Sequence, residues 1–509
     1  MRLLKIKLKN FRSYNDQVEL SIGDLTTLVG KNDIGKSSIL EALDIFFNKG
    51  KGAIKMDKDD VNKKCLSNDD TETEIALTFD QFPSSIVIDS TNETSLDDEY
   101  LLNSENYLEI IKRYKNGGSE KVFIKSNHPS NENCSDLLLK KQKDLQKIIQ
   151  EQEIECENKT RNAVMRTAIW NHYSDDLNLQ ETEIDVTKGD TKSIWDKLEN
   201  YLPLYSLFQS DRKNSDGDNE VQDPLSEAVK QIMNNEEIQE TLAQVAEKVE
   251  SKLTEVAGLT LDKLREMNPE IADSLNPVIP PSDSLKWNDV FKKVSIAGDE
   301  DIPINKRGSG VKRLILLNFF RAEAERRKLE QNIPSIIYAI EEPETSQHTA
   351  HQKMLINALL ELSNTDNTQI LLTTHSPVIV KELDFGHLRL ILLEDEEKVV
   401  KSVLPGQLPY PSLNEVNFIA FEEITEEYHN ELYGYLESEG LINNFKNGKE
   451  TVEYIRLKRD GSTQNEQKVL TEYIRHQIHH PENTHNEKYT ETQLLDSIEM
   501  MRDFIQNEN

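Results

Sequence analysis

The sequence contains little cysteine and no long apolar run. Its three cysteines, Cys65, Cys134 and Cys156, are odd in number and lack the close pairing of a zinc site, so neither a disulfide framework nor a cysteine-ligated metal is supported. No window reaches the roughly 18 consecutive apolar residues of a membrane span. The N-terminus alternates charged with apolar side chains and has no signal-peptide core. We therefore expect no membrane contact and no export, but a cytoplasmic protein.

Positive charge is also scarce, because 60 lysines and arginines are set against 92 aspartates and glutamates, which gives a formal net charge of -32. Such a surface repels nucleic-acid phosphates and argues against a histone-like or scanning DNA binder. Any nucleic-acid contact must therefore be local. The first stretch is nonetheless basic, through Lys5, Lys7, Lys9, Arg12, Lys31, Lys36, Lys49, Lys51, Lys55 and Lys58.

The length of 509 residues, at about 150 residues per domain, predicts two to four domains. The hydrophobic content of 36% is ample for packed cores. Near the N-terminus the pattern predicts strands over 3–11, 17–22 and 25–29, then a helix over 36–47. Further strands are expected over 74–79, 107–114 and 121–125.

The sequence patterns in the middle and at the end of the chain predict helices. Residues 134–173 are rich in Lys, Glu and Gln and have the apolar spacing of a helical arm, and amphipathic helices are expected over 224–264. At the C-terminal end, helices are predicted over 426–436, 466–479 and 491–505. These three helices predict a small helical bundle.

The segment Gly30 to Ser37 satisfies the P-loop pattern G-x-x-x-x-G-K-[ST] between a predicted strand and a predicted helix. Backbone N–H groups of such a turn bind phosphates, a lysine reaches the β- and γ-phosphates, and a serine ligates Mg²⁺. The alternative is a glycine turn that only joins strand to helix. The predicted nucleotide-binding residues here are Gly30, Asn32, Gly35, Lys36, Ser37 and Ser38.

A second apolar strand, over 335–340, ends in the paired carboxylates Glu341 and Glu342, which is the form of a Walker B motif. Glu341 would hold Mg²⁺ and Glu342 would polarise the attacking water. The alternative is an acidic helix start that follows a core strand.

Two further segments complete the predicted site. His375 follows the apolar run 369–372, at a strand end where α/β proteins form ligand sites, and it is predicted to contact the γ-phosphate or the attacking water; a structural histidine is the alternative. Ser309 and Gly310 open an apolar helix, whose N-terminus can donate N–H groups to an anion, although a helix cap is the plainer interpretation.

In this order, with Lys9 to Tyr14 as a first strand and turn, the motifs resemble ABC-type ATPases related to SMC, RecF and OLD proteins. The resemblance covers about residues 1–404 apart from the helical middle, and it implies two ATPase heads that sandwich two nucleotides. Ser309 and Gly310 would then complete the partner's P-loop. It also implies that Gln81 is a Q-loop residue near the metal, with a surface glutamine as the alternative. The implied cofactors are ATP and Mg²⁺.

Arg475 and His480, five residues apart with a polar residue after the arginine, resemble the R-polar-x3-H pattern of HEPN ribonucleases. Cleavage of RNA without metal needs a base, an acid and a cation; His480 could serve as the first two and Arg475 as the third. The resemblance implies a site shared across a dimer. The alternative is a solvated helix face or a capping interaction.

Together these features predict an α/β ABC/SMC-like ATPase head with a helical insertion arm and a small C-terminal all-α bundle. The expected domains are an N-terminal ATPase lobe (1–130), the arm (131–285), a second ATPase lobe (286–404) and a HEPN-like module (405–509). The predicted function is anti-phage defence, in which ATP binding or hydrolysis by a homo-oligomer controls cleavage of tRNA or other RNA. A phage trigger or a partner defence protein is also expected.

Two alternatives stay open. The first is an OLD- or Septu-like ATPase subunit that senses phage and recruits or regulates a separate nuclease. The second is a RecF-like DNA-repair ATPase with no nuclease.

Overall fold

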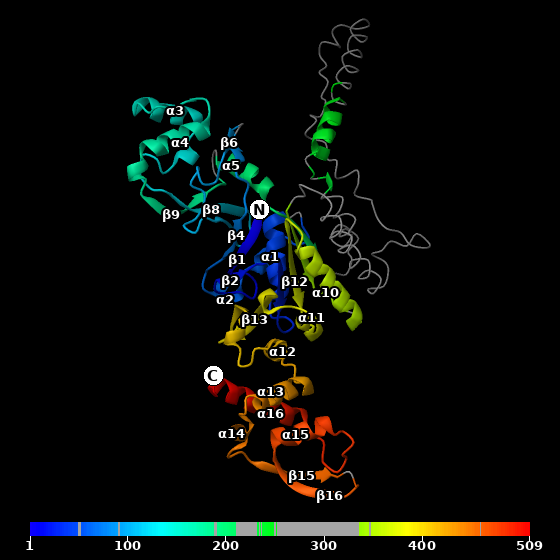
Figure 1. The fold of residues 1–509 in the computed structure, drawn as a ribbon. Helices are drawn as coiled ribbons and strands as arrows, with labels where there is room; N and C mark the ends of the chain where they lie inside the picture. The colour runs from blue at the N-terminus through cyan, green and yellow to red at the C-terminus, as the bar shows by residue number, and fades with distance from the viewer. Residues whose placement is uncertain are drawn as a thin grey trace.

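The computed structural model describes residues 1–48, 52–89, 92–187, 191–209, 335–345, 348–458 and 460–508, with short pieces between 232 and 251. Within them, two six-stranded sheets and their helices form the body of the molecule, and a smaller module follows at the C-terminal end (Figure 1). The predicted α/β fold class is thereby confirmed.

The first sheet is antiparallel and has the strand order β2-β1-β4-β7-β8-β9. Ile6 and Leu8 of β1 are fully buried, whereas Lys7 and Lys9 point away from the core, as expected for a sheet with one covered face. The strands are β1 (Arg2–Lys9), β2 (Val18–Ser21), β4 (Glu72–Asp80), β7 (Leu108–Lys115), β8 (Glu120–Pro129) and β9 (Leu179–Asp185).

The second sheet has the order β10-β11-β12-β3-β13-β14, and only its last pair is antiparallel. The chain leaves the first sheet after β2 and enters this one at β3, between two strands that come more than 300 residues later. The strands are β3 (Leu25–Val29), β10 (Leu204–Phe208), β11 (Ile336–Glu341), β12 (Thr368–Thr374), β13 (Leu388–Glu394) and β14 (Glu397–Ser402).

Helices cover both faces of the second sheet. Ile39, Leu43 and Phe46 of α1 share a core with side chains of both sheets, so α1 fills the space between them. On the other face, side chains of three helices join Tyr338 and Leu372 in a separate core. The helices are α1 (Lys36–Asn48), α10 (Thr349–Ser363), α11 (Pro377–Lys381) and α12 (Leu413–Phe421).

The predicted helical arm over 131–285 differs from the structure in part. Helices α3 (Gln142–Glu151), α4 (Asn162–His172) and α5 (Thr191–Leu198) are present, but β9 joins the first sheet and β10 joins the second. Most residues of β9 are polar and exposed, so no apolar alternation marked it as a strand. Up to β10, this segment therefore belongs to the two sheets of the head and their core.

The C-terminal module contains α13 (Glu426–Ser438), α14 (Ile442–Lys446), α15 (Leu470–His479) and α16 (Glu491–Glu508), which surround a core of their own. It also contains a hairpin, β15 (Thr451–Leu457) and β16 (Thr463–Val469), which was not predicted. Residues 466–469 belong to β16, so the helix expected over 466–479 begins only at Leu470. The strand was not predicted because the sequence of β16 is polar and lacks alternating apolar residues.

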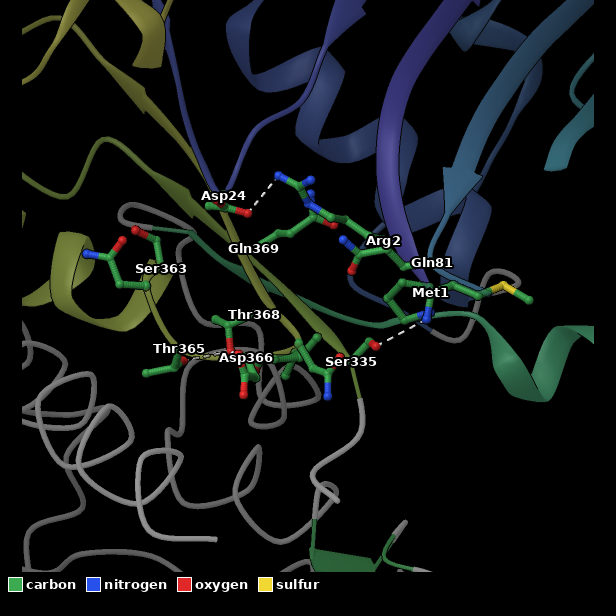
Figure 2. A pocket seen from close by; sticks show the side chains of 14 residues that line it. Met1, Arg2, Asp24, Gln81, Ser335, Ser363, Thr365, Asp366, Thr368 and Gln369 are labelled. Atoms are coloured by element: carbon green, nitrogen blue, oxygen red, sulfur yellow. Dashed lines mark hydrogen bonds and ion pairs between the residues drawn. The ribbon is translucent and has the colours of Figure 1, made fainter. Parts of the chain in front are cut away.

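Three short elements of the described chain are α2 (Lys63–Ser67), β5 (Ile86–Asp89) and β6 (Asn92–Thr94). At the amino ends of β1, β3, β11 and β12 lies a polar cavity of about 310 Å³, bordered by Met1, Arg2, Asp24 and Gln81 (Figure 2). None of the helices that the structure describes is long and apolar enough to cross a membrane.

Candidate nucleotide site

The P-loop lies between β3 and α1, as its motif predicts. A Cβ atom at position 30 would lie 2.6 Å from the carbonyl oxygen of Ile391, and one at position 35 would lie 2.7 Å from Ser13 Oγ. Gly35 also has a φ of +108°, which favours glycine. The hydroxyl of buried Tyr14 donates to the Gly35 carbonyl over 2.9 Å. The turn is thus held close to its neighbours, with room for glycine only.

Lys36 opens α1 and is 4% exposed. Its Nζ donates to the carbonyl oxygens of Gly30 (2.7 Å) and Lys31 (2.8 Å), so the ammonium group lies inside the turn. Burial lowers the pKa of Lys36, and the negative charges of Glu342 and Glu344 act in the opposite direction. A cation at this point is suited to bind phosphate oxygens.

The other predicted P-loop residues lie around Lys36. Asn32 is exposed, and Ser37 and Ser38 are half-buried in the first turn of α1. No acidic side chain occupies that first turn, so the positive end of the helix dipole is available to an anion. The glycine cradle and the Ser37 hydroxyl therefore fit a nucleotide triphosphate with Mg²⁺.

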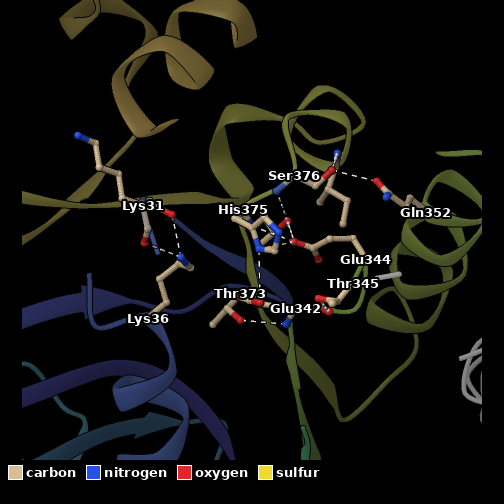
Figure 3. A network of polar contacts seen from close by, with 12 residues as sticks. Lys31, Lys36, Glu342, Glu344, Thr345, Gln352, Thr373, His375 and Ser376 are labelled. Carbon is tan, nitrogen blue, oxygen red and sulfur yellow. Dashed lines mark hydrogen bonds and ion pairs between the residues drawn. The ribbon is translucent and has the colours of Figure 1, made fainter. Parts of the chain in front are cut away.

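The strand register brings the three separate motifs to one edge of the second sheet. Glu341 at the end of β11 lies opposite Thr373 of β12, and Thr374 lies opposite Val29 of β3. Because the strands are parallel, the side chains that follow them meet at the carboxyl edge, where α/β sheets bind ligands. Figure 3 shows Lys36, Glu342 and His375 around this edge.

Glu342 and His375 face each other at this edge. The Glu342 N–H donates to the carbonyl oxygen of Thr373 (3.2 Å) and to its Oγ1 (3.1 Å), which fixes the turn after β11. Glu342 Oε2 lies 3.4 Å from His375 Nδ1. The imidazole is 39% exposed, so it is held on one side and open on the other.

Glu344 is a site residue that the sequence analysis missed. Its side chain is 3% exposed, and its Oε1 accepts hydrogen bonds from Thr374 Oγ1 (2.7 Å) and from the His375 N–H (2.9 Å). Burial raises the pKa of the Glu344 carboxyl, although both hydrogen bonds favour the charged form. A third carboxylate, two residues after the predicted catalytic pair, was the available signal.

In the C-terminal module, Arg475 and His480 lie against different neighbours. Arg475 Nη2 is 2.8 Å from Glu437 Oε2 on α13, and its guanidinium carbon lies 4.2 Å from the centre of the Tyr433 ring. His480, 55% exposed at the end of α15, has its Nδ1 3.2 Å from Glu482 Oε1. Arg475 therefore faces α13, whereas His480 lies at the exposed end of α15.

A sequence profile described as an AAA ATPase domain matches residues 1–380. The chain belongs to the AAA ATPase domain family. The match begins before β1 and ends within α11, so it includes the P-loop, the Glu341–Glu342 pair and His375. Helix α12 and the C-terminal module lie beyond the AAA ATPase domain.

Two curated proteins resemble the chain. Endonuclease GajA from Bacillus cereus (strain VD045) is 24% identical over 409 residues, 79% of this chain and 60% of that protein. The OLD nuclease from Thermus scotoductus (strain ATCC 700910 / SA-01) is 30% identical over 166 residues, 33% of this chain and 28% of that protein. The chain thus spans about 60% of the length of the first relative and 28% of the second.

Two solved structures similar to this AAA ATPase chain are heads of SMC proteins. The SMC head domain from Thermotoga maritima is 12% identical and covers 79% of this chain and 100% of its own, with a TM-score of 0.32. The Smc head with an extended coiled coil bound to the C-terminal domain of ScpA, from Pyrococcus furiosus, is 14% identical and covers 79% and 96%, with a TM-score of 0.38.

The structure does not bring Gln81 to the nucleotide site of the AAA ATPase domain. Because β4 is antiparallel to β1, Gln81 follows β4 beside Met1 and Arg2, at the amino edge of the sheets (Figure 2). A glutamine that follows a strand at the carboxyl edge is Gln209, which comes after β10, is 8% exposed and donates from Nε2 to Glu41 Oε1 on α1 (3.2 Å). The sequence signal for Gln209, which the sequence analysis missed, was its place directly after the apolar run of β10.

The last two predicted residues of the AAA ATPase site, Ser309 and Gly310, lie outside the described residues. Their role in completing a partner's site stays a prediction.

Proposed function

We propose that the AAA ATPase domain binds ATP with Mg²⁺ at the carboxyl edge of the second sheet and hydrolyses it. Lys36 binds the β- and γ-phosphates, and Ser37 and Glu341 supply oxygen ligands for Mg²⁺. Glu342 polarises the attacking water, and His375 contacts the γ-phosphate. The metal would neutralise phosphate charge, while the chain's own residues orient the reactants.

The observation that carries this proposal is the convergence of the three motifs. Thr374, the last residue of β12, pairs with Val29, the last residue of β3, so His375 follows β12 next to the start of the P-loop. Lys36 lies in the electrostatic field of Glu341, Glu342 and Glu344. Phosphoryl transfer needs chiefly positioning and charge neutralisation, and this edge combines a cation with carboxylates around a glycine cradle.

The variants Lys36→Ala and Glu342→Gln test two separate steps of the proposal, ATP binding and ATP hydrolysis. Lys36→Ala should weaken ATP binding at least about tenfold, because the phosphates lose their cation. Glu342→Gln should keep ATP affinity but lose about 100-fold or more in turnover, because the attacking water loses its base. Lys353→Ala is the matched control, since Lys353 on α10 is half exposed and pairs with Glu382, which follows α11. Parental turnover in Glu342→Gln would contradict the assignment.

We also propose that the ATPase serves anti-phage defence by controlling nucleic-acid cleavage. The support is the similarity to two proteins named as nucleases, the endonuclease GajA and an OLD nuclease. The chain spans only part of both, so the cleaving component has to be tested separately.

One candidate for that component is the C-terminal module as a HEPN-like, metal-independent ribonuclease. His480 would act as base and acid and Arg475 would stabilise the transferring phosphate of tRNA or another RNA. The exposure of His480 at the end of α15 supports this role, since RNA could reach the imidazole. The proposed assembly is a homo-dimer or higher oligomer through the heads and the modules, in which Ser309 and Gly310 complete a partner's nucleotide site.

Incubation of the purified chain with tRNA and single-stranded RNA in EDTA tests the ribonuclease, with ATP, a slowly hydrolysed analogue or no nucleotide. The expected products carry 2′,3′-cyclic phosphate ends and disappear in His480→Ala. The matched control is His485→Ala, because His485 is an exposed histidine five residues further along. Cleavage that persists in His480→Ala contradicts the assignment.

The second candidate is a separate nuclease that the ATPase recruits or regulates. The different neighbours of Arg475 and His480 favour it, because Arg475 pairs with Glu437 on α13 whereas His480 pairs with Glu482 beyond the end of α15. Absence of RNA cleavage in every nucleotide state, together with a nuclease that co-purifies with the intact chain and is lost on disruption of the module, would establish this candidate.

A further inference from the structure

Glu344 is a buried acid for which the ATPase function proposed above has no role. Removing a carboxylate from water is costly unless hydrogen bonds replace the lost hydration. Here one oxygen, Oε1, accepts both from Thr374 Oγ1 and from the His375 N–H, whereas the buried Oε2 has no hydrogen-bond partner among the described residues. Both donors belong to the turn that carries His375, so the carboxylate is kept in place by that turn.

The imidazole of His375 also faces Glu344. His375 Nδ1 lies 3.4 Å from Glu344 Oε1 and 3.4 Å from Glu342 Oε2, between the two carboxylates. Since the two ring nitrogens lie on different sides of an imidazole, Nε2 is the nitrogen left for a phosphate oxygen or a water molecule. Glu344 therefore contacts the backbone and the ring of the same residue (Figure 3).

We infer that Glu344 is the positioning residue of His375: it fixes the β12–α11 turn and the orientation of the imidazole, and it contacts neither nucleotide nor water itself. The inference rests on the ATPase function proposed above. The inference assigns different roles to two neighbouring carboxylates. Glu342 is 27% exposed and open to the reactants, whereas Glu344 is 3% exposed and contacts the histidine. The interaction of Ser376 Oγ with Gln352 Oε1 (2.9 Å) supports the same turn from α10.

A double-mutant cycle on ATP hydrolysis tests this inference, with Glu344→Ala, His375→Ala and the double variant. If Glu344 acts through His375, Glu344→Ala should lower kcat about 10- to 100-fold with KM within about threefold, and it should cost less than about threefold when His375 is already alanine. Glu361→Ala is the matched control, because Glu361 is an exposed glutamate on α10.

Glu344→Gln guards against a loss of folding, since the amide is nearly isosteric and its oxygen still accepts from both donors. It should retain a higher kcat than Glu344→Ala, and its melting temperature should stay near that of the parent. A purely structural residue would lower the melting temperature and the active fraction in both His375 backgrounds alike, so the effects would multiply instead of saturating.

The outcomes separate this inference from the proposed function. Multiplying effects in an active parent overturn the role of Glu344 alone, and so does a Glu344→Ala variant with parental kcat. A parent that does not hydrolyse ATP, or a Glu342→Gln variant as active as the parent, overturns the ATPase assignment and the role of Glu344 with it.

Discussion

The ion pair between Glu415 and Arg502 should be costly to break, because one of its charges is fully buried. Glu415 on α12 has a side chain that is 0% exposed, and Arg502 on α16 contacts its two oxygens at 2.6 Å and 3.0 Å. The variant Arg502→Met leaves this carboxylate without its cation, and such a loss typically costs about 3–5 kcal/mol. The double variant Glu415→Gln with Arg502→Met should recover more than half of that amount, because no buried charge remains.

The pH dependence of this loss has a defined sign. Burial raises the pKa of Glu415, and Arg502 lowers it, with burial the larger effect. A carboxyl with a raised folded-state pKa stabilises the fold when it is protonated, and this stabilisation is lost as the pH rises through the folded value. Without Arg502 the pKa rises further, so the loss in Arg502→Met should be largest at neutral pH and should shrink on acidification.

Hydrogen exchange of α12 and α16, read by mass spectrometry over a range of pH, measures the local opening free energy of these helices. Arg456→Met is the matched control, because Arg456 pairs with Glu466 on the exposed hairpin. A loss in Arg502→Met below about 1 kcal/mol, or one that does not change with pH, would refute this reasoning.

Three other predictions concern separate parts of the chain. Gly35→Ala, at a φ of +108°, should reduce ATP affinity at least about tenfold in equilibrium binding while the overall melting curve changes little. Arg166→Met should remove the buried ion pair between Arg166 and Glu99 and speed proteolysis within α4, where Arg166→Lys should speed it less. Burial alone would raise the pKa of Glu472, but hydrogen bonds from two lysines lower it to about 2. Glu472→Gln should therefore destabilise the module above about pH 4, and this difference should vanish as the pH falls towards 2 in urea titrations.

The motifs of the candidate nucleotide site could be found in the sequence because each of them is local. The glycines around Lys36 and the carboxylates after β11 carry their chemistry within a few residues. Their meeting also followed from a general rule, since parallel strands bring their carboxyl ends to one edge. Glu344 was missed because its role depends on contacts with Thr374 and His375, which come thirty residues later in the chain.

The fold was harder to predict wherever strand pairing is distant or the strand is polar. Gln81 was placed near the metal because it follows a strand, but the antiparallel pairing of β4 with β1 takes it to the opposite edge. The strands β9 and β16 are both largely exposed. Because neither has a buried apolar face, their sequences lack the alternating hydropathy from which a strand is predicted. A hairpin is instead marked by its turn, where Gly461 has a φ of +83°.

Helix α12 belongs to two cores at once. Val416 and Ala420 are buried with the helices and strands of the ATPase head, whereas Phe418 is buried in the core of the C-terminal module. The border between the two parts therefore runs through the interior of one helix. A truncation before residue 413 would uncover apolar side chains of the head, and an exchange of the C-terminal module for another domain would have to keep α12 and its spacing. A domain joined after Phe421 would therefore have to supply a cation for Glu415 and an apolar surface for Phe418, because both residues stay behind on α12.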